Sequence, residues 1–234
     1  MIPYERRQIL LQTLENSEFV STEQLIAAVE GASESTIRRD LKALADEGQI
    51  TLLRGGASKL RSGTTPDTRV DSKLILNVEA KEKIARYAAG LVQEGEVIYL
   101  DAGTTPLRMI PYLRDKRITI VTTNVLIFQE LGGTSAECII VGGGVNVEMG
   151  SVVGDLTVST LEDMFFDRAF IGITGIAPRS GFSTPDLKES RKKSVVKRNS
   201  KHSYILADSS KVGITSMCKV FELDEITLIT EKEE

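Results

Sequence analysis

Three cations stand close together in one short stretch of this acidic chain, SESTIRRDLKALADEG, residues 33–48. Arginine and lysine neutralise phosphates and contact base edges, so this spacing suggests DNA binding. On a helix the apolar side chains would share one face, and the cations would take the opposite arc near the helix start, which is the layout of a recognition helix. The apolar face comprises Ile37, Leu41 and Leu44. The residues predicted to contact DNA are Ser35, Thr36, Arg38, Arg39 and Lys42.

The elements around this stretch support the same prediction. Two helical patterns precede it, one over about residues 4–14 and one opening at Ser21, which has capping-box spacing to Gln24. Ser33 is the expected N-cap of the third helix. The run QITLLRGGASKLR that follows is β-prone around a glycine turn. It predicts a hairpin wing, in which Arg54 is a further DNA contact.

Two other interpretations compete with DNA binding. A charged helix face is usually only solvated, but the tight helix spacing and the basic wing favour a nucleic-acid contact. A protein-binding module would carry apolar residues on the outward face of the third helix, and the sequence has cations there. The formal net charge of −4 argues against unspecific nucleic-acid binding but is compatible with a local positive patch.

A second set of candidates follows five predicted strands in the rest of the chain. Short apolar runs alternate with helical patterns, which indicates a mainly parallel sheet covered on both faces. About 160 residues are too few for a (β/α)₈ barrel, so we expect an open α/β sheet whose strand ends converge on one ligand crevice. The strand ends carry five clusters: Asp101, Gly103, Thr104 and Thr105; Thr123 and Asn124; Gly142, Gly143 and Gly144; Gly172 and Gly175; and Asp208, Ser210 and Lys211.

The motif DAGTTPLRMI, residues 101–110, is the most specific of these clusters. Gly103 would let the backbone approach a ligand, and Thr105 would cap a helix that has Pro106 at its first position. Free N–H groups at such a helix end favour an anion, with phosphate the obvious candidate, and Lys211 would add a point charge. The competing interpretation is structural, with ordinary caps, turn glycines and a solvated lysine.

The basic run KESRKKSVVKRNSK, residues 188–201, is interpreted as a solvated helix that covers the sheet. A minor role for Lys192 or Lys193 near the crevice mouth stays open. An enzyme is the main alternative function, but no spacing among the acidic and basic residues specifies a mechanism, and it would leave the helix-turn-helix idle. The residues available for such acid–base chemistry are Asp101, Glu148, Asp208 and Lys211.

The predicted organisation has three parts. A winged helix-turn-helix domain occupies residues 1–60, a linker rich in Gly, Thr, Pro and Asp occupies 61–74, and an α/β sensor domain occupies 75–234. No apolar run is long enough for a membrane helix and no secretory signal is recognised, so a reducing cytoplasm is expected. With one histidine and two unpatterned cysteines, neither a metal site nor a cofactor is predicted.

The stretch STIRRDLKALADEGQITLLRGGA closely resembles the DNA-binding signature of the DeoR family of bacterial sugar-metabolism regulators. In the wing, Leu52 and Arg54 stand where the family pattern usually has a basic residue and a histidine. The remainder resembles the family's sensor domain through YLDAGTT, VTTN, AFIGITGI, GFSTPDLKES and ILADSSKVG, with Lys188 where an acidic residue is expected.

This resemblance implies both a fold and a function. Sensor domains of this family are similar in fold to ribose-5-phosphate isomerase and coenzyme A transferases, and family members respond to a phosphorylated sugar. The resemblance implies a non-enzymatic repressor of a sugar-catabolism operon, which a sugar phosphate in the crevice releases from a double-stranded DNA operator. Because one recognition helix covers half of a palindromic site, a homodimer or homotetramer is expected.

Overall fold

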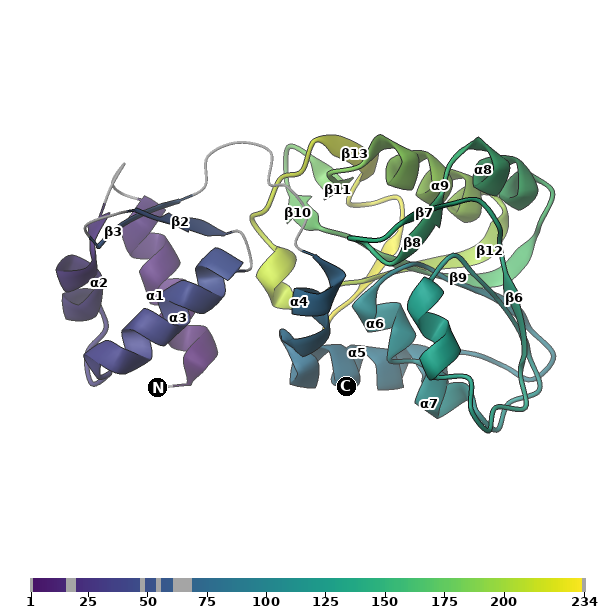
Figure 1. The fold of residues 1–234 in the computed structure, drawn as a ribbon, viewed down its shortest axis with the longest axis horizontal. Coiled ribbons are helices and arrows are strands. Elements are labelled where there is room, and N and C mark those ends of the chain that lie inside the picture. Colours follow the sequence, from purple (N-terminus) through teal and green to yellow (C-terminus); the bar gives the residue numbers. More distant parts are fainter. Residues whose placement is uncertain (1, 16–19, 47–48, 54–55, 61–68, 233–234) are drawn as a thin grey trace. The chain divides into compact units, whose positions relative to one another are not determined.

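The computed structural model describes residues 2–15, 20–46, 49–53, 56–60 and 69–232. The chain divides into two compact units, Met1–Thr68 and Arg69–Glu234 (Figure 1). Most of the predicted linker lies outside the described residues. Its last positions, however, belong to helix α4, Val70–Ile75, in the second unit. The linker is therefore shorter at its C-terminal end than the sequence predicts.

The first unit packs helices against a small antiparallel sheet. Its helices are α1 Pro3–Glu15, α2 Thr22–Ala28 and α3 Glu34–Asp46. Its strands are β1 Val20–Ser21, β2 Ile50–Leu52 and β3 Ala57–Leu60, in the spatial order β1-β3-β2. Strands β2 and β3 pair as the predicted hairpin.

The helix starts of this unit follow the predicted caps. The Ser21 hydroxyl accepts from the Gln24 amide, and the Gln24 side chain accepts from the Ser21 amide, which completes a capping box. The Ser33 hydroxyl accepts from the Thr36 amide at 3.3 Å. The apolar stripe of α3 is buried with residues from α1, α2 and β2, so each helix is stabilised by packing rather than by its own propensity.

The second unit is built on a six-stranded parallel sheet in the order β14-β12-β9-β4-β5-β6. The strands are β4 Val97–Leu100, β5 Thr119–Thr122, β6 Glu137–Ile140, β9 Phe166–Gly172, β12 Ser200–Leu206 and β14 Thr227–Ile229. From β4 the chain first builds outward through β5 and β6, then returns to place β9, β12 and β14 on the other side. Strand order therefore reverses between β4 and β9.

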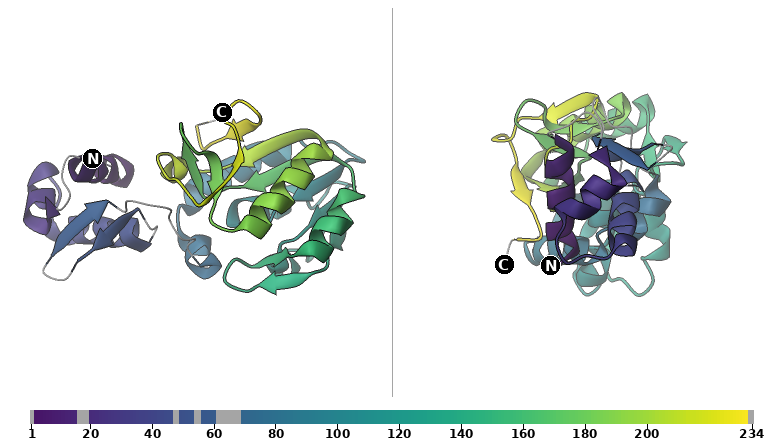
Figure 2. Two further views of the ribbon diagram at one scale, coloured as in Figure 1. Left: turned by 90° about the horizontal axis from the view of Figure 1, so that it is seen from above. Right: turned by 90° about the vertical axis from the view of Figure 1, so that its left-hand side faces the viewer.

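Helices cover both faces of this sheet, as the continuous apolar runs predicted. Ile98 and Leu100 of β4 belong to one buried cluster with α5 and α7, whereas Tyr99 belongs to the cluster under α8 and α9. Figure 1 shows the two helical layers on opposite sides of the strands, and Figure 2 shows α8 and α9 side by side. The covering helices are α5 Val78–Gly90, α6 Thr104–Leu107, α7 Ile110–Leu113, α8 Asp155–Glu162 and α9 Leu187–Arg198.

Shorter elements flank the sheet. A hairpin of β7 and β8 follows β6, and a three-stranded sheet has the order β10-β11-β13. The bounds are β7 Gly144–Asn146, β8 Ser151–Val153, β10 Gly175–Ala177, β11 Gly181–Thr184 and β13 Cys218–Phe221, with short 3₁₀ helices η1 Val125–Gln129 and η2 Ser209–Lys211. Among the described residues, no helix has both the length and the apolar character needed to span a membrane.

Candidate DNA-binding face and effector crevice

The candidate DNA contacts lie on the exposed side of α3. Ser35, Arg38, Arg39 and Lys42 are exposed, opposite the buried stripe, as their helical spacing predicted. Thr36 differs, because it is half-buried and its hydroxyl lies 2.8 Å from that of Ser33, where it belongs to the helix cap. The predicted wing contact Arg54 lies outside the described residues.

The acidic residue that follows the arginine pair holds the helix in place. Asp40 is 4% exposed, and its carboxylate accepts from Arg6 Nε of α1 at 2.8 Å, with Arg7 Nε at 3.5 Å. A buried carboxylate needs such partners, so α1 and α3 are locked together by charge as well as by apolar packing. Sequence reasoning missed this role, although the arginine pair near the N-terminus was a signal for it.

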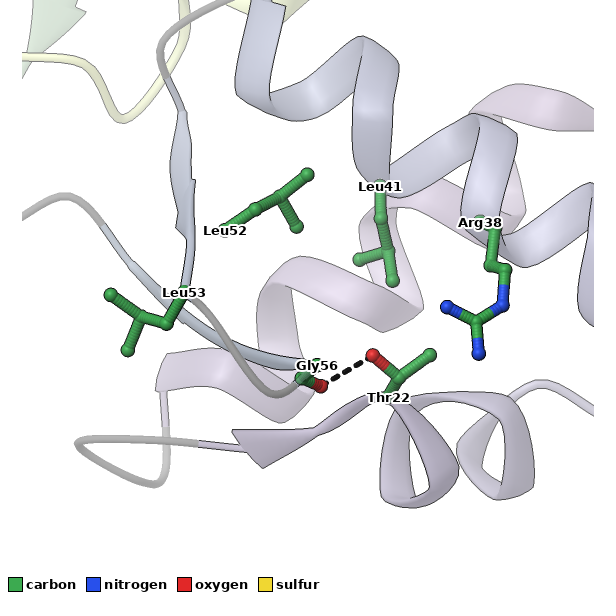
Figure 3. Close-up of a pocket in the computed structure, with 6 residues that line it drawn as sticks. All are labelled: Thr22, Arg38, Leu41, Leu52, Leu53 and Gly56. Atoms are coloured by element: carbon green, nitrogen blue, oxygen red, sulfur yellow. Dashed lines mark hydrogen bonds between the residues drawn. The ribbon is translucent and has the colours of Figure 1, made fainter.

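A hollow of about 240 Å³ separates α3 from the wing (Figure 3). Arg38 and Leu41 point from α3 toward Thr22 and Gly56, whose hydroxyl and carbonyl are hydrogen-bonded. The Thr22 amide also donates to the Gly56 carbonyl at 2.7 Å, so the start of β3 is fixed to α2. Arg38 is paired with Glu34 one turn earlier, at 2.7 Å. Residues of α3 and of the β2–β3 hairpin therefore line the same hollow, and Arg38 is one of them.

The strand ends of the second unit converge where the strand order reverses. Asp101 follows β4 at the centre of the sheet, and its Oδ2 accepts from the Gly172 amide at the end of β9 at 3.1 Å. This contact joins the two strands that border the reversal. In open α/β sheets ligands bind at that point, outside the carboxyl ends of the strands. The topology therefore places the predicted clusters along one edge, as expected.

A buried ionic cluster, comprising Asp101, Glu189, Lys192 and Lys193, lies beneath this edge. Lys193 Nζ donates to Asp101 Oδ2 at 2.5 Å and to Glu189 Oε2 at 2.8 Å. Lys192 Nζ donates to Glu189 Oε1 at 2.8 Å and to Ser151 Oγ at 2.8 Å. All four charged side chains are at most 4% exposed. The interpretation of this helix as fully solvated is therefore wrong for Glu189, Lys192 and Lys193.

The ionic cluster shifts the pKa values of Glu189 and Lys193 in the direction that keeps both groups charged. Burial alone would raise the pKa of Glu189, but Lys193 and Lys192 outweigh it and hold that pKa well below its ordinary value. Burial alone would lower the pKa of Lys193, but Asp101 and Glu189 raise it. Burial and the charge of Asp101 raise the pKa of Tyr99 well above its ordinary value, so its hydroxyl stays protonated.

Several predicted crevice residues have their polar groups occupied by the protein. The Asn124 carbonyl oxygen accepts from the Leu126 amide at 3.0 Å, and its amide donates to the Gly103 carbonyl at 3.1 Å. The Thr123 hydroxyl lies 2.8 Å from that of Tyr99. These contacts match the structural interpretation, in which the residues hold neighbouring strand-end loops together.

Two further predicted residues also serve the fold. Asp208 is 2% exposed and caps η2, where its carboxylate accepts from the Ser210 amide at 3.1 Å. Gly143 has a φ of +151°, and a Cβ there would lie 2.0 Å from Thr157 Oγ1. The glycine is therefore required by packing against α8.

Donors in the motif after β4 remain available. Helix α6 is only four residues long, its N-cap is Gly103, and Pro106 is its third residue, so the prediction that Thr105 caps the helix is wrong. The backbone amides of Thr104 and Thr105 donate no hydrogen bond to any of the described residues. Lys211, at the end of η2, is half-buried, and among the described residues its ammonium has no hydrogen-bond or ion-pair partner. An anion at this edge would find these donors ready.

Comparison with known proteins decides the family. Residues 6–62 match the model of the DeoR-like helix-turn-helix domain, and residues 76–232 match that of the DeoR C terminal sensor domain. The chain belongs to the DeoR family.

Full-length relatives support this assignment. The DeoR-family chain is 36% identical over 235 residues to the uncharacterized HTH-type transcriptional regulator FruR of Bacillus subtilis, covering 98% of this chain and 91% of that protein. It is 33% identical to the HTH-type transcriptional regulator GlpR of Haloferax volcanii, covering 97% and 89%. The glycerol-3-phosphate regulon repressor of Escherichia coli is 28% identical, with 96% and 89% covered.

Solved structures resemble this DeoR-family chain at the level of fold. A chain of the tetrameric eIF2B-beta2-delta2 complex from C. thermophilum aligns with a TM-score of 0.52 and 14% identity, covering 98% of this chain and 82% of that one. Ribose 5-phosphate isomerase A from Methanocaldococcus jannaschii aligns over 58% of this chain and 55% of the isomerase, with a TM-score of 0.42 and 19% identity.

Proposed function

We propose that this DeoR-family regulator represses a sugar-catabolism operon and that a phosphorylated sugar in the strand-end crevice weakens its binding to operator DNA. The proposal rests on one combination of features: the first unit exposes cations on α3, and in the second unit the Thr104 and Thr105 amides and the Lys211 ammonium have no partner among the described residues. The proposed place of action is the cytoplasm, where the operator lies.

On the DNA side, α3 enters the major groove with its N-terminal half. Arg38 and Arg39 contact base edges or phosphates, Lys42 neutralises a phosphate one turn later, and Ser35 lies near the helix start. Arg54 of the wing adds a further cation. One α3 covers one half-site, so a homodimer or homotetramer binds a palindromic operator.

On the effector side, the phosphate is bound by the Thr104 and Thr105 amides and by the Lys211 ammonium. Strands β4 and β12 both neighbour β9, so their ends lie about 10 Å apart, a span that a sugar phosphate can bridge. Gly103, Thr123, Asn124 and Asp208 shape the loops around it. The Escherichia coli relative is a glycerol-3-phosphate regulon repressor, which supports a phosphorylated ligand for this chain.

The saturation of Asp101 favours a sensor over an enzyme. Its two carboxylate oxygens accept from Lys193, from the Gly172 amide and from Tyr99. A general base must reach the substrate proton with an uncommitted lone pair, and this carboxylate is buried among donors. Acid–base catalysis by the residue most central to the crevice is therefore disfavoured.

A thermal-shift screen against glycerol 3-phosphate, ribose 5-phosphate, fructose 6-phosphate and inorganic phosphate tests the effector class. A ligand at 100 times its dissociation constant adds about 2.7 kcal/mol to native stability, which raises the midpoint measurably. Selection of duplexes from a random library tests DNA recognition in parallel. A protein that enriches no duplex at low salt, or that isomerises one of these sugar phosphates at a high rate, would contradict the proposal.

A further inference from the structure

Helix α4 is the first described element after the linker. It begins at Val70, immediately after the boundary between the two units, and its residues pack within the second unit. The orientation of α4 therefore fixes where the chain leaves the second unit. Whatever holds or releases α4 changes the constraint on the segment that joins it to the DNA-binding unit.

Three ties hold α4, and they come from the β7–β8 turn, from the end of α6 and from the loop after β12. At its start, the Val70 amide donates to the Glu148 carbonyl of the β7–β8 turn at 2.8 Å. At its end, Arg108 Nη2 donates to the Leu74 carbonyl at 3.0 Å. Arg108 is the C-cap of α6 and stands three residues after Thr105, in the motif proposed to bind the phosphate.

The third tie comes from the loop after β12. Asn77 Nδ2 donates to Asp208 Oδ1 at 3.1 Å and to Ser210 Oγ at 3.0 Å. Asn77 separates α4 from α5, and it is the one non-glycine residue with a positive φ, 50°, among the described residues. A left-handed conformation is uncommon outside glycine, and asparagine tolerates it best, so these contacts favour the sharp turn between the helices.

A buried lysine completes the attachment of α4. Lys81 of α5 is 4% exposed and donates to the Leu76 carbonyl at 2.7 Å and to the Lys73 carbonyl. These are carbonyls at the C-terminal end of α4, which lack partners inside the helix. The end of α4 is thus held by two cations, Arg108 and Lys81, and by the turn at Asn77.

We propose that Asn77 and Arg108 are positioning residues that couple effector binding at the strand-end loops to the orientation of α4 and hence to DNA affinity. This inference rests on the proposed function for its effector, but not for its effect on DNA binding. Asn77 donates to Asp208 and Ser210, which lie in the same loop as Lys211. Arg108 caps the C-terminal end of α6, the helix that contains Thr105. An effector that draws Lys211 and the Thr105 amide toward one phosphate changes both loops at once and weakens their bonds to α4.

A ligand shifts a conformational equilibrium only through its different contacts in the two states. The two states here are α4 tied, which favours DNA binding, and α4 released, which does not. Typical coupling between two sites corresponds to a 5- to 150-fold change in affinity. Loss of one tie by mutation should therefore reproduce part of the effector response without any effector.

The test uses the full-length chain and a duplex selected with the wild-type protein. Asn77→Gly keeps the left-handed turn and removes the amide, and Arg108→Met removes the guanidinium while keeping much of the apolar stem. Arg117→Met is the control, because the side chain of Arg117 is 89% exposed and far along the chain from α4. Anisotropy measures the Kd for DNA with and without saturating glycerol 3-phosphate or the best sugar phosphate of the screen, and calorimetry measures the affinity for that sugar phosphate.

Without sugar phosphate, Asn77→Gly and Arg108→Met should bind DNA at least fivefold more weakly than wild type and the control. The additional loss on adding sugar phosphate should shrink, and calorimetric affinity for the sugar phosphate should rise, because the released state that binds it is already more populated. A merely destabilised sensor unit would lose that affinity instead. Wild-type DNA affinity in both variants, with unchanged far-UV circular dichroism, would overturn the inference. If the wild type ignores the whole panel while both variants lose DNA affinity, the inference stands and the proposed effector class fails.

Discussion

Lys193 of α9 donates to Asp101 at the end of β4 at 2.5 Å, although the two residues are 92 positions apart in the chain. The bond joins α9, which covers one face of the sheet, to the end of β4, where the strand order reverses. Glu189 and Lys192 complete the ionic cluster from the same helix. The end of β4 is therefore held by buried charge as well as by apolar packing.

Glu189→Gln should destabilise the second unit by about 3–5 kcal/mol, because it leaves two buried ammonium groups with only one carboxylate. Urea unfolding at neutral pH measures the change. Asp155→Asn is the control, because the Asp155 side chain is 96% exposed and its ion pair with Arg191 lies at the surface. A loss no larger than that of the control would mean that the ionic cluster does not contribute as its geometry indicates.

Lys81→Met should change the pH dependence of stability. Burial lowers the pKa of Lys81 to about 8, against the opposing attraction of Asp208. Between about pH 8 and the ordinary pKa of lysine, Lys81 is protonated in the unfolded chain but largely deprotonated in the folded chain. The free energy of unfolding of the wild type therefore rises with pH across this window. Relative to Lys81→Met, the wild type should gain roughly 2–3 kcal/mol between about pH 7.5 and pH 10.

The exposed Lys83 on the same helix supplies the control for that experiment. The Lys83→Met variant should follow the wild-type profile throughout. If the free energy of unfolding varied with pH in the same way for the wild type and Lys81→Met, burial would not lower the pKa of Lys81.

Gly143→Ala should cost about 1–3 kcal/mol, because the added methyl group meets Thr157 Oγ1 and the backbone already has a positive φ. Gly142→Ala should be nearly neutral, since nothing lies within 4 Å of a Cβ there. Thermal unfolding compares the two. If Gly143→Ala left stability unchanged but reduced binding of a sugar phosphate, the glycine would serve the ligand rather than the fold.

Arg39→Ala should weaken binding to the selected duplex by about 1–3 kcal/mol and leave thermal unfolding unchanged, because the side chain is exposed on α3. Kd values measured across a salt series show whether Arg39 contacts a phosphate or a base. Loss of a phosphate contact lowers the slope of log affinity against log salt concentration by about one. Unchanged affinity would remove Arg39 from the recognition surface.

Lys211→Met should weaken binding of a sugar phosphate about 10- to 150-fold, the range for a lost bond to a charged group. Calorimetry with the best ligand of the screen measures it, and DNA affinity without ligand should stay at the wild-type value. Lys219→Met is the control, because Lys219 is paired with Glu222 on the surface. Equal ligand affinity in both variants would place the phosphate elsewhere.

Local patterns in the sequence were enough to predict the first unit. The caps at Ser21 and Ser33, the stripe on α3 and the hairpin all depend on neighbours within a few residues, so periodicity and capping chemistry predicted them. The open parallel sheet followed from apolar runs of strand length. The role of Asp40 was missed because its partners come from α1, and sequence spacing does not show tertiary pairing.

The shared strand-end edge was predictable in place, but the contacts of its side chains were not. Parallel strand ends must share one edge, so the positions of Asp101, Thr123 and Asp208 could be expected. Whether each polar group faces a ligand or the protein depends on contacts across the fold. Lys193 illustrates this: it stands in a run of cations typical of a solvated helix, yet it is buried, because Asp101 and Glu189 supply the compensating charge.

The most direct test of the central claim is a titration of the protein–DNA complex with sugar phosphates, followed by fluorescence anisotropy of the labelled duplex. Glycerol 3-phosphate, ribose 5-phosphate and fructose 6-phosphate are compared with inorganic phosphate and with the unphosphorylated sugars. We expect at least one sugar phosphate to weaken DNA binding 5- to 150-fold and its unphosphorylated form to leave DNA binding unchanged. Equal release by the unphosphorylated sugar, or a complex that binds a sugar phosphate with no change in DNA affinity, would contradict it.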